Sequence, residues 1–103
     1  MIKLTFSEKI VFLLEQLDCT SNDLANKSNI SSSTISRYKN GERTPDIGSK
    51  QLDNLINGLI DLGKEKNIIY DKSVLLNEFN EILQNENGNF VIIKEILISY
   101  IRL

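Results

Sequence analysis

Residues 20–45 read TSNDLANKSNISSSTISRYKNGERTP, and this stretch has the pattern of two short helices joined by a tight turn. Thr20 and Asp23 have the three-residue spacing of a capping box, in which both side chains bond to backbone amides at the start of a helix. The residues of this first helix that share one narrow inner face are Leu24, Ala25 and Ser28. We expect the helix to stop at Asn29, because asparagine tolerates the left-handed backbone conformation that commonly ends a helix.

A second helix is expected directly after the turn. Ile30 should point back toward the core, and Ser31 is placed to cap a helix over residues 32–40. Gly41 is expected to end that helix, and Pro45 prevents any continuation because proline lacks the amide hydrogen that a helix needs. The stretch therefore predicts a helix, a turn and a second helix in close succession.

The faces of this second helix differ in chemistry. Ile35 and Tyr38 are three residues apart, so they face the same way, and we expect both to anchor the helix to the core. Short hydroxyl side chains and two cations fall on the other faces, at Ser32, Ser33, Ser36, Arg37 and Lys39. We expect this outward side to be a recognition surface.

These residues resemble the phage-repressor-type helix-turn-helix, also described as Cro/lambda-repressor-like or XRE. The resemblance covers residues 5–62, and its matching pieces are Asp23-Leu24-Ala25, Ile30, Ser31-Ser32-Ser33-Thr34-Ile35-Ser36-Arg37 and Asn40-Gly41-Glu42-Arg43-Thr44-Pro45. It implies an all-α fold with a four-helix, lambda-repressor-like core. Two positions depart from the family's pattern: Asn29 stands where glycine is preferred, and Lys39 stands where glutamate is frequent. The second departure implies that an ion pair common in the family is missing.

The resemblance also implies which residues would contact double-stranded DNA. In such motifs the second helix lies in the major groove and the first helix crosses the backbone. The base-reading positions carried over are Ser32, Ser33 and Arg37, and the phosphate-contacting positions are Ser21, Lys39, Asn40, Arg43 and Thr44. The chemistry of Arg37 agrees, because a guanidinium can bind guanine O6 and N7 together. The alternatives are a solvated Arg37 on a surface helix and a helix-capping role for Asn40.

A helix is also expected before the motif. Thr5 and Glu8 repeat the capping-box spacing, and apolar residues at helical intervals predict a helix over residues 6–17. Phe12 lies beside that apolar stripe and is expected to add to the core. Cys19 is expected to pack as a small apolar residue at the end of this helix.

Another helix is expected after Pro45. An apolar stripe over residues 52–62 predicts an amphipathic helix that is capped by Asp46 or Ser49 and closed by Gly63. Gly58 weakens such a helix by about 1 kcal/mol relative to alanine. We expect packing to compensate, through a close crossing with another helix.

Residues 64–67, of which three are charged, form the clearest internal boundary. We therefore expect a helix-turn-helix domain over residues 1–66 and a C-terminal extension over residues 67–103. Asp71 or Ser73 is placed to cap a helix in this extension. The apolar residues on one broad side of that helix are Val74, Leu75, Leu76, Phe79, Ile82 and Leu83.

The final segment of the sequence is unusually apolar. After a predicted break at residues 87–89, the polar residues of the segment 90–103 fall on one narrow helical stripe, which favours a second helix of a C-terminal pair. We expect the segment to be buried by the preceding helices, by a second subunit or by further C-terminal sequence. The residues expected at a dimer interface are Phe90, Ile93, Leu97 and Ile101. The end at Leu103 also favours the N-terminal part of a longer protein.

Composition limits the chemistry available to the chain. Its 103 residues include one cysteine and no histidine, which excludes a disulfide framework, a Cys/His zinc site and a histidine base. We therefore expect no metal, no cofactor and no enzymatic activity. With neither a signal-peptide core nor an apolar run long enough to span a membrane, we expect a cytoplasmic protein that does not contact membranes.

The charge distribution bears on the partner. The chain has 12 basic and 14 acidic residues, yet residues 30–45 carry three basic residues against one acidic residue. A weak cationic patch on an acidic body is compatible with DNA binding, but it favours a dimer or a larger protein over a tight monomer. The leading prediction is a sequence-specific, DNA-binding transcriptional regulator that acts as a homodimer on an inverted repeat. The alternative is a protein-interaction module with the same fold, either a docking domain of a larger protein or an antitoxin-like partner.

Overall fold

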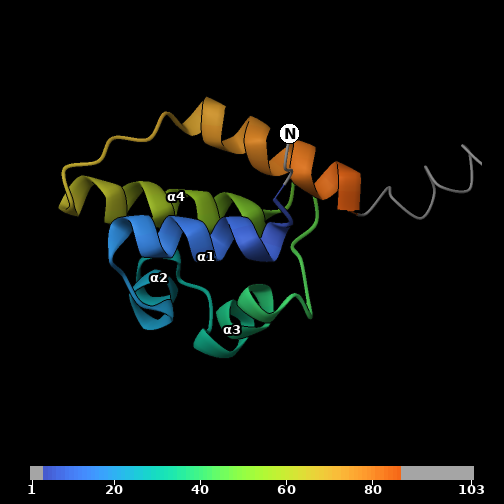
Figure 1. The fold of residues 1–103 in the computed structure, drawn as a ribbon, viewed down its shortest axis with the longest axis horizontal. Coiled ribbons are helices and arrows are strands. Elements are labelled where there is room, and N and C mark those ends of the chain that lie inside the picture. The colour runs from blue at the N-terminus through green and yellow to red at the C-terminus, as the bar shows by residue number, and fades with distance from the viewer. Residues whose placement is uncertain (1–3, 87–103) are drawn as a thin grey trace, which may run out of the picture.

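The computed structural model describes residues 4–86, and every regular element in this range is a helix. The helices are α1 (Phe6–Leu17), α2 (Ser21–Ser28), α3 (Ser32–Asn40), α4 (Lys50–Glu65) and a further helix over residues 72–86, referred to below as the 72–86 helix. Figure 1 shows α1 and α4 side by side in a middle layer, with the 72–86 helix on one side and α2 and α3 on the other. For residues 4–86 the predicted all-α fold with a lambda-repressor-like core is confirmed. The break at 87–89 and the helix over 90–103 lie outside the described residues.

Short-range capping sets the starts of the long helices. The Thr5 hydroxyl accepts from the Glu8 amide at 3.1 Å, and the Thr5 amide donates to Glu8 Oε1 at 2.9 Å. α1 therefore begins with the predicted capping box. The Ser49 hydroxyl accepts from the Leu52 amide at 3.1 Å, so Ser49, and not Asp46, caps α4.

One hydrophobic core joins the helices, and Phe6 lies at its centre. The Phe6 ring meets Tyr38 of α3 edge to face, with centroids 5.4 Å apart, and meets Phe79 of the 72–86 helix at 5.6 Å. All three rings are buried. The Phe6 side chain of α1 thus contacts both α3 and the 72–86 helix. The described part of the predicted extension packs on the same core as the helix-turn-helix segment, and the division into residues 1–66 and 67–103 stays a prediction.

The 72–86 helix contributes one line of buried residues. Leu75, Phe79 and Leu83 follow one another at four-residue intervals and are fully buried, whereas Val74 is 55% exposed. The prediction that Val74 belongs to the buried side is wrong, because one residue corresponds to a rotation of about 100° around the helix. At the start of the helix Asp71 Oδ1 accepts from the amides of Ser73 and Val74, so Asp71 is the capping residue.

At the other end of the 72–86 helix, Glu86 reaches α1. Its Oε1 accepts from the Phe6 amide at 2.9 Å. Lys9 of α1 and Glu78 form an ion pair at 3.5 Å. The 72–86 helix is therefore held to α1 by polar contacts as well as by the core.

Two glycines of α4 permit close approach of the chain. Gly58 faces Ser28 of α2, which confirms the predicted close crossing. Gly63 does not close the helix, which continues to Glu65, so that prediction is wrong. A Cβ on Gly63 would lie 2.5 Å from the Ile68 carbonyl oxygen and 3.0 Å from the Tyr70 ring. Glycine is needed at this position because the chain folds back against it, and not because the helix ends there.

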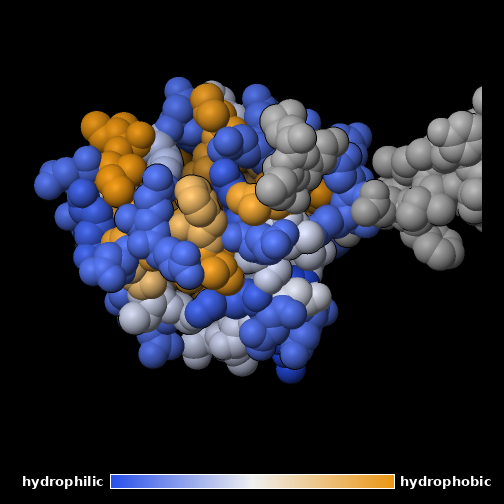
Figure 2. Space-filling view, viewed as in Figure 1, coloured by the Kyte–Doolittle hydropathy of each residue, from blue (hydrophilic) through white to orange (hydrophobic). Residues whose placement is uncertain are grey.

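Phe12 and Cys19 were both predicted to pack in the core, and the structure places them in different environments. Phe12 is 49% exposed, so the prediction that it adds to the core is wrong. It precedes the buried Leu13 and Leu14, and the helical rotation carries it off the buried stripe. Cys19 packs half-buried against the core as expected, and burial raises the pKa of its thiol. In the view of Figure 2 the apolar side chains lie mostly in the upper half, and the end of the molecule where α3 lies is polar.

Candidate nucleic-acid interface

The turn between α2 and α3 is built as the sequence predicts. Asn29 has φ 57° and ψ 36°, the left-handed conformation that ends α2. Ile30 is buried in the core. The Ser31 hydroxyl accepts from the Thr34 amide at 3.2 Å and so caps α3. Three residues, Asn29, Ile30 and Ser31, thus connect α2 to α3.

The start of α2 is closed by a second capping box. The Thr20 hydroxyl accepts from the Asp23 amide at 3.1 Å, and the Thr20 amide donates to Asp23 Oδ2 at 2.9 Å. Donation from the Thr20 amide, supported by its hydroxyl, lowers the pKa of Asp23 below its ordinary value. The body of α2 packs on α4.

α3 is attached to the core by two residues. Ile35 and Tyr38 are both buried, as predicted. Gly41, at φ 77°, ends the helix in a left-handed conformation, so Gly41, and not Asn40, is its C-cap residue. The remaining faces of α3 are free of core contacts.

The outward side of α3 holds all three residues predicted to read bases. Ser32, Ser33 and Arg37 are exposed. Ser36 and Asn40 are exposed too, and the spacing from Ser33 through Ser36 and Arg37 to Asn40 places the four side chains on one helical face. Ser36 was not among the predicted base-reading residues, although this spacing is visible in the sequence.

Ser21 and Lys39, both predicted phosphate contacts, lie together. Lys39 Nζ donates to Ser21 Oγ at 2.9 Å, which joins the start of α2 to the last turn of α3. Ser7 of α1 donates its hydroxyl to the Lys39 carbonyl oxygen. A lysine–serine hydrogen bond thus connects the two helices, and it places an ammonium group beside the first turn of α2.

The remaining predicted phosphate contacts follow one another at the end of α3. Asn40 is the last residue of the helix and is exposed, as is Arg43. Thr44 is half-buried and precedes the buried Pro45. These residues therefore form a second group, at the C-terminal end of α3.

Comparison with known families identifies this arrangement. Residues 12–49 match the family model described as Helix-turn-helix. This part of the chain is a helix-turn-helix domain. The match begins within α1, includes all of α2 and α3, and ends at the residue that caps α4. Searches of curated proteins and of solved structures gave no match. Helix-turn-helix domains are in general the DNA-binding parts of regulatory proteins, with the second helix as the recognition helix.

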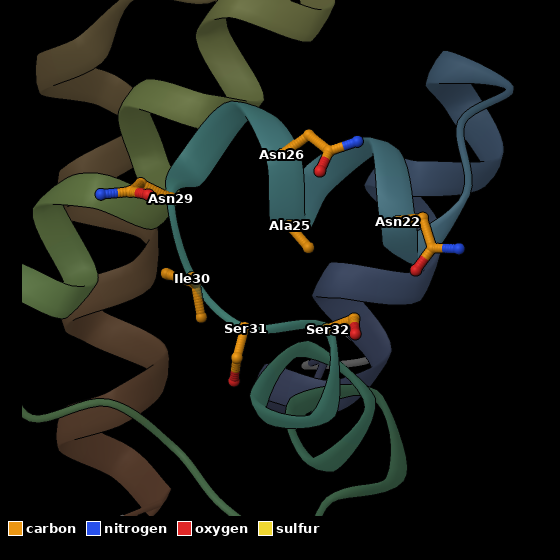
Figure 3. Close-up of a pocket in the computed structure, with 7 residues that line it drawn as sticks. All are labelled: Asn22, Ala25, Asn26, Asn29, Ile30, Ser31 and Ser32. Atoms are coloured by element: carbon orange, nitrogen blue, oxygen red, sulfur yellow. The ribbon is translucent and has the colours of Figure 1, made fainter.

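A hollow of about 580 Å³ lies between the two helices of the helix-turn-helix. From α2 it is lined by Asn22, Ala25 and Asn26, and from the turn and the start of α3 by Asn29, Ile30, Ser31 and Ser32. Figure 3 shows Ala25 pointing from α2 into the space between the helices, with Ser31 and Ser32 on the opposite side. No charged side chain is among these seven residues. Neither Asn22 nor Asn26 was among the predicted site residues, although their four-residue spacing on a short helix is visible in the sequence.

Within residues 4–86 no group of acidic, cysteine or histidine side chains is arranged to hold a metal ion. In the same range no helix combines the length and the apolar character that crossing a membrane requires.

Proposed function

We propose that this chain binds double-stranded DNA sequence-specifically, with α3 in the major groove, and that it regulates transcription. The observation that carries the proposal is the outward face of α3, where Ser33, Ser36, Arg37 and Asn40 are exposed while two other residues anchor the helix. These side chains can donate to and accept from base edges. They have no role in the core, so the fold leaves them available for a partner.

The proposed contacts divide by chemistry. Arg37 binds guanine in a bidentate manner, and Ser32 and Ser33 approach neighbouring base edges from the N-terminal half of α3. The phosphate contacts come from two groups at the margins of the helix: Ser21 and Lys39, and Asn40, Arg43 and Thr44. The 2.9 Å hydrogen bond between Lys39 and Ser21 supports this assignment, because it holds a cation at the start of α2.

The overall charge favours a dimer as the binding form. The chain has a formal net charge of −2, so a single copy offers DNA little general attraction. Two copies on an inverted repeat, with half-sites about 34–36 Å apart, would double the number of phosphate contacts. The residues proposed for the dimer interface, Phe90, Ile93, Leu97 and Ile101, lie outside the described residues. Light scattering on the chain of 11.7 kDa tests the dimer directly, because a monomeric mass in the presence of an inverted repeat would contradict it.

DNA binding itself is tested by titration with DNA of varied sequence. A randomised duplex pool is first selected on the wild-type protein, and dissociation constants are then measured by fluorescence anisotropy from 50 to 300 mM KCl, roughly the range over which such contacts weaken steeply. We expect binding that weakens with salt and a clear preference for the selected duplex over mixed-sequence DNA. Absence of binding at the lowest salt concentration would reject the proposal.

The second candidate is a protein-interaction module with the same fold. It is favoured by the acidic net charge and by exposed apolar side chains away from α3, among them Phe12 at 49% and Ile69 at 88%. Single exposed apolar residues are common on soluble proteins, so this support is weaker. In the same titration a docking module would give no DNA binding at any salt concentration.

A further inference from the structure

The dipeptide Asn-Gly occurs twice within residues 4–86, in two different settings. Asn40-Gly41 lies at the end of α3, and Asn57-Gly58 lies in the middle of α4. An asparagine followed by glycine is prone to lose its side-chain amide, because glycine has no side chain to obstruct attack by its own backbone nitrogen on the asparagine side chain. A third pair, Asn87-Gly88, lies outside the described residues.

The fold holds the Asn57-Gly58 pair in place. Asn57 is half-buried, and its side-chain amide donates to Asp53 Oδ2 at 3.3 Å. A Cβ on Gly58 would lie 2.8 Å from the Ser28 Cβ, so α2 confines the backbone at this point. Rotating the peptide bond toward the asparagine side chain would break hydrogen bonds in mid-helix and separate α4 from α2. The reaction at this pair therefore requires opening of the core.

The Asn40-Gly41 pair is held much less firmly. Asn40 is the last residue of α3, and both residues are exposed. The Gly41 amide is shared between the carbonyl oxygens of Arg37 and Tyr38, and its distance to the latter is 3.3 Å. A Cβ on Gly41 would meet only the Ser7 Cβ, at 3.8 Å, and Gly41 borders a hollow of about 420 Å³. Rotation here costs the fraying of one terminal helical turn, which is the part of a helix that opens most readily.

We infer that Asn40-Gly41 is a site of spontaneous covalent modification, in which the Gly41 nitrogen attacks Asn40 Cγ. The bond from this nitrogen to Cγ forms and the bond from Cγ to Nδ2 breaks. The leaving nitrogen takes up the Gly41 amide proton and departs as ammonia. Water then adds to either carbonyl carbon of the cyclic imide and opens it, which leaves aspartate or isoaspartate at position 40. Both products place a carboxylate at the C-terminal end of α3, where the helix dipole disfavours negative charge.

The modification changes the surface that we propose binds DNA, and this consequence rests on the proposed function. Asn40 is one of the proposed phosphate contacts, and a carboxylate in its place repels phosphate. One such charge at contact distance should weaken binding by about 5-fold at low salt, and by less as salt screens it. The protein therefore loses affinity for DNA with age, without the action of an enzyme.

The site is tested by peptide mapping of the full chain after incubation at neutral and mildly alkaline pH. Mass spectrometry measures the loss of the side-chain amide at each asparagine. In the folded protein we expect Asn40 to react at least about 10-fold faster than Asn57, because the terminal turn opens more readily than the middle of α4. Both reactions should be faster at alkaline pH, since the glycine amide must lose its proton.

The protein unfolded in urea is the control for the effect of the fold. There Asn40 and Asn57 should react at similar rates, because glycine follows both. If Asn40 reacted no faster than Asn57 in the folded protein, the inference would be wrong. A preference for Asn40 that persisted undiminished in urea would also overturn it, because the fold would then not be its cause.

The consequence for DNA is measured by fluorescence anisotropy on the selected duplex and on a mixed-sequence duplex, with each aged protein compared with its own fresh sample. The wild type should lose affinity for both duplexes. Asn40→Gln should keep its starting affinity, because the longer side chain forms a cyclic imide far more slowly. Any reaction at Asn87 is common to both proteins and does not affect the comparison. Asn40→Asp, which creates one of the products directly, should bind about 5-fold more weakly than the fresh wild type.

The outcomes separate the modification from the function. If position 40 is modified and affinity for DNA stays unchanged, the consequence for DNA binding is wrong. If the fresh wild type binds neither duplex at low salt, the proposed function fails, whereas the peptide map still decides whether Asn40-Gly41 is a modification site.

Discussion

Gly58 of α4 lies so close to Ser28 of α2 that a Cβ on the glycine would be 2.8 Å from the Ser28 Cβ and 2.9 Å from its Cα. Ser28 is itself buried, and its hydroxyl donates to the Leu24 carbonyl oxygen at 2.6 Å. The helix that precedes the turn is thus held to the core by direct backbone approach. Because the nearest atoms include backbone, a rotamer change cannot relieve a clash at this point.

We therefore expect Gly58→Ala to destabilise the domain by about 1–3 kcal/mol, although alanine is the better helix former. Urea unfolding measures the change. Asn57→Ala, at the neighbouring half-buried position of α4, is the control and should alter stability far less. A stabilised Gly58→Ala protein would show that α2 and α4 are not in close contact in solution.

Arg37 and Arg43 should affect DNA binding in different ways. Arg37→Ala is expected to cost about 1–3 kcal/mol on the selected duplex and to relax the preference at one base pair. Arg43→Ala should weaken binding to all duplexes equally. It should also reduce the slope of log Kd against log salt concentration, called the salt slope below, by about 1. Dissociation constants on a set of single-base variants of the selected duplex distinguish the two. If both variants bound every duplex as the wild type does, the assignment of these residues would be wrong.

The pair of Lys39 and Ser21 allows a structural role to be separated from a binding role. Lys39→Met removes the ammonium group and keeps most of the side-chain volume, so we expect uniformly weaker DNA binding and a salt slope reduced by about 1. Ser21→Ala removes the same hydrogen bond and leaves the cation in place. If both variants lowered thermal stability equally, and neither changed the dependence of DNA binding on salt, the role of Lys39 would be limited to holding the two helices together.

The capping boxes predict how stability depends on pH. Donation from the Thr5 amide, supported by its hydroxyl, lowers the pKa of Glu8, and the Thr20 amide and hydroxyl lower the pKa of Asp23 in the same way. Since each pKa is lower in the folded state, the stabilisation is present above the ordinary carboxyl range of about 4 and is lost as pH falls through the lowered values.

Urea unfolding between pH 7 and pH 3, roughly the range in which carboxylates become protonated, measures this loss. Replacing Glu8 by glutamine or Asp23 by asparagine should lower stability near neutral pH and flatten its fall in acid. Glu15→Gln, at an exposed position of α1, is the control. If the free energy of unfolding still fell steeply in acid in both variants, the pH dependence would originate elsewhere in the chain.

Local signals explain why the helix boundaries were predicted well. The pairs Thr5 with Glu8 and Thr20 with Asp23 are three residues apart, so their capping geometry can be recognised without knowledge of the fold. The left-handed Asn29 and the buried Ile30 depend equally on short-range chemistry. For the site, exposure of Ser32, Ser33 and Arg37 followed from the period of α3, whereas their contacts with bases stay a prediction.

The features that sequence analysis missed depend on contacts between distant residues. Gly63 looks like a helix end in the sequence. Only the structure shows that the chain folds back and places Ile68 and Tyr70 against it. The bond from Lys39 to Ser21 spans 18 residues, and the bond from the Phe6 amide to Glu86 spans 80 residues. The helical spacing of residues in the sequence does not reveal such pairings, because they depend on how the helices assemble.

The outward face of α3 lies apart from Ile35 and Tyr38, the two residues that anchor the helix in the core, and this has a consequence for how the protein can change. Substitutions at Ser33, Ser36 and Asn40 remove no buried contact, so stability disfavours mainly the poor helix formers, proline and glycine, at these positions. A lineage, or an experimenter, can therefore vary the target of the domain while keeping the same scaffold. Randomising those three codons with proline and stop codons left out, in a selection for new binding sites, should yield mostly folded proteins.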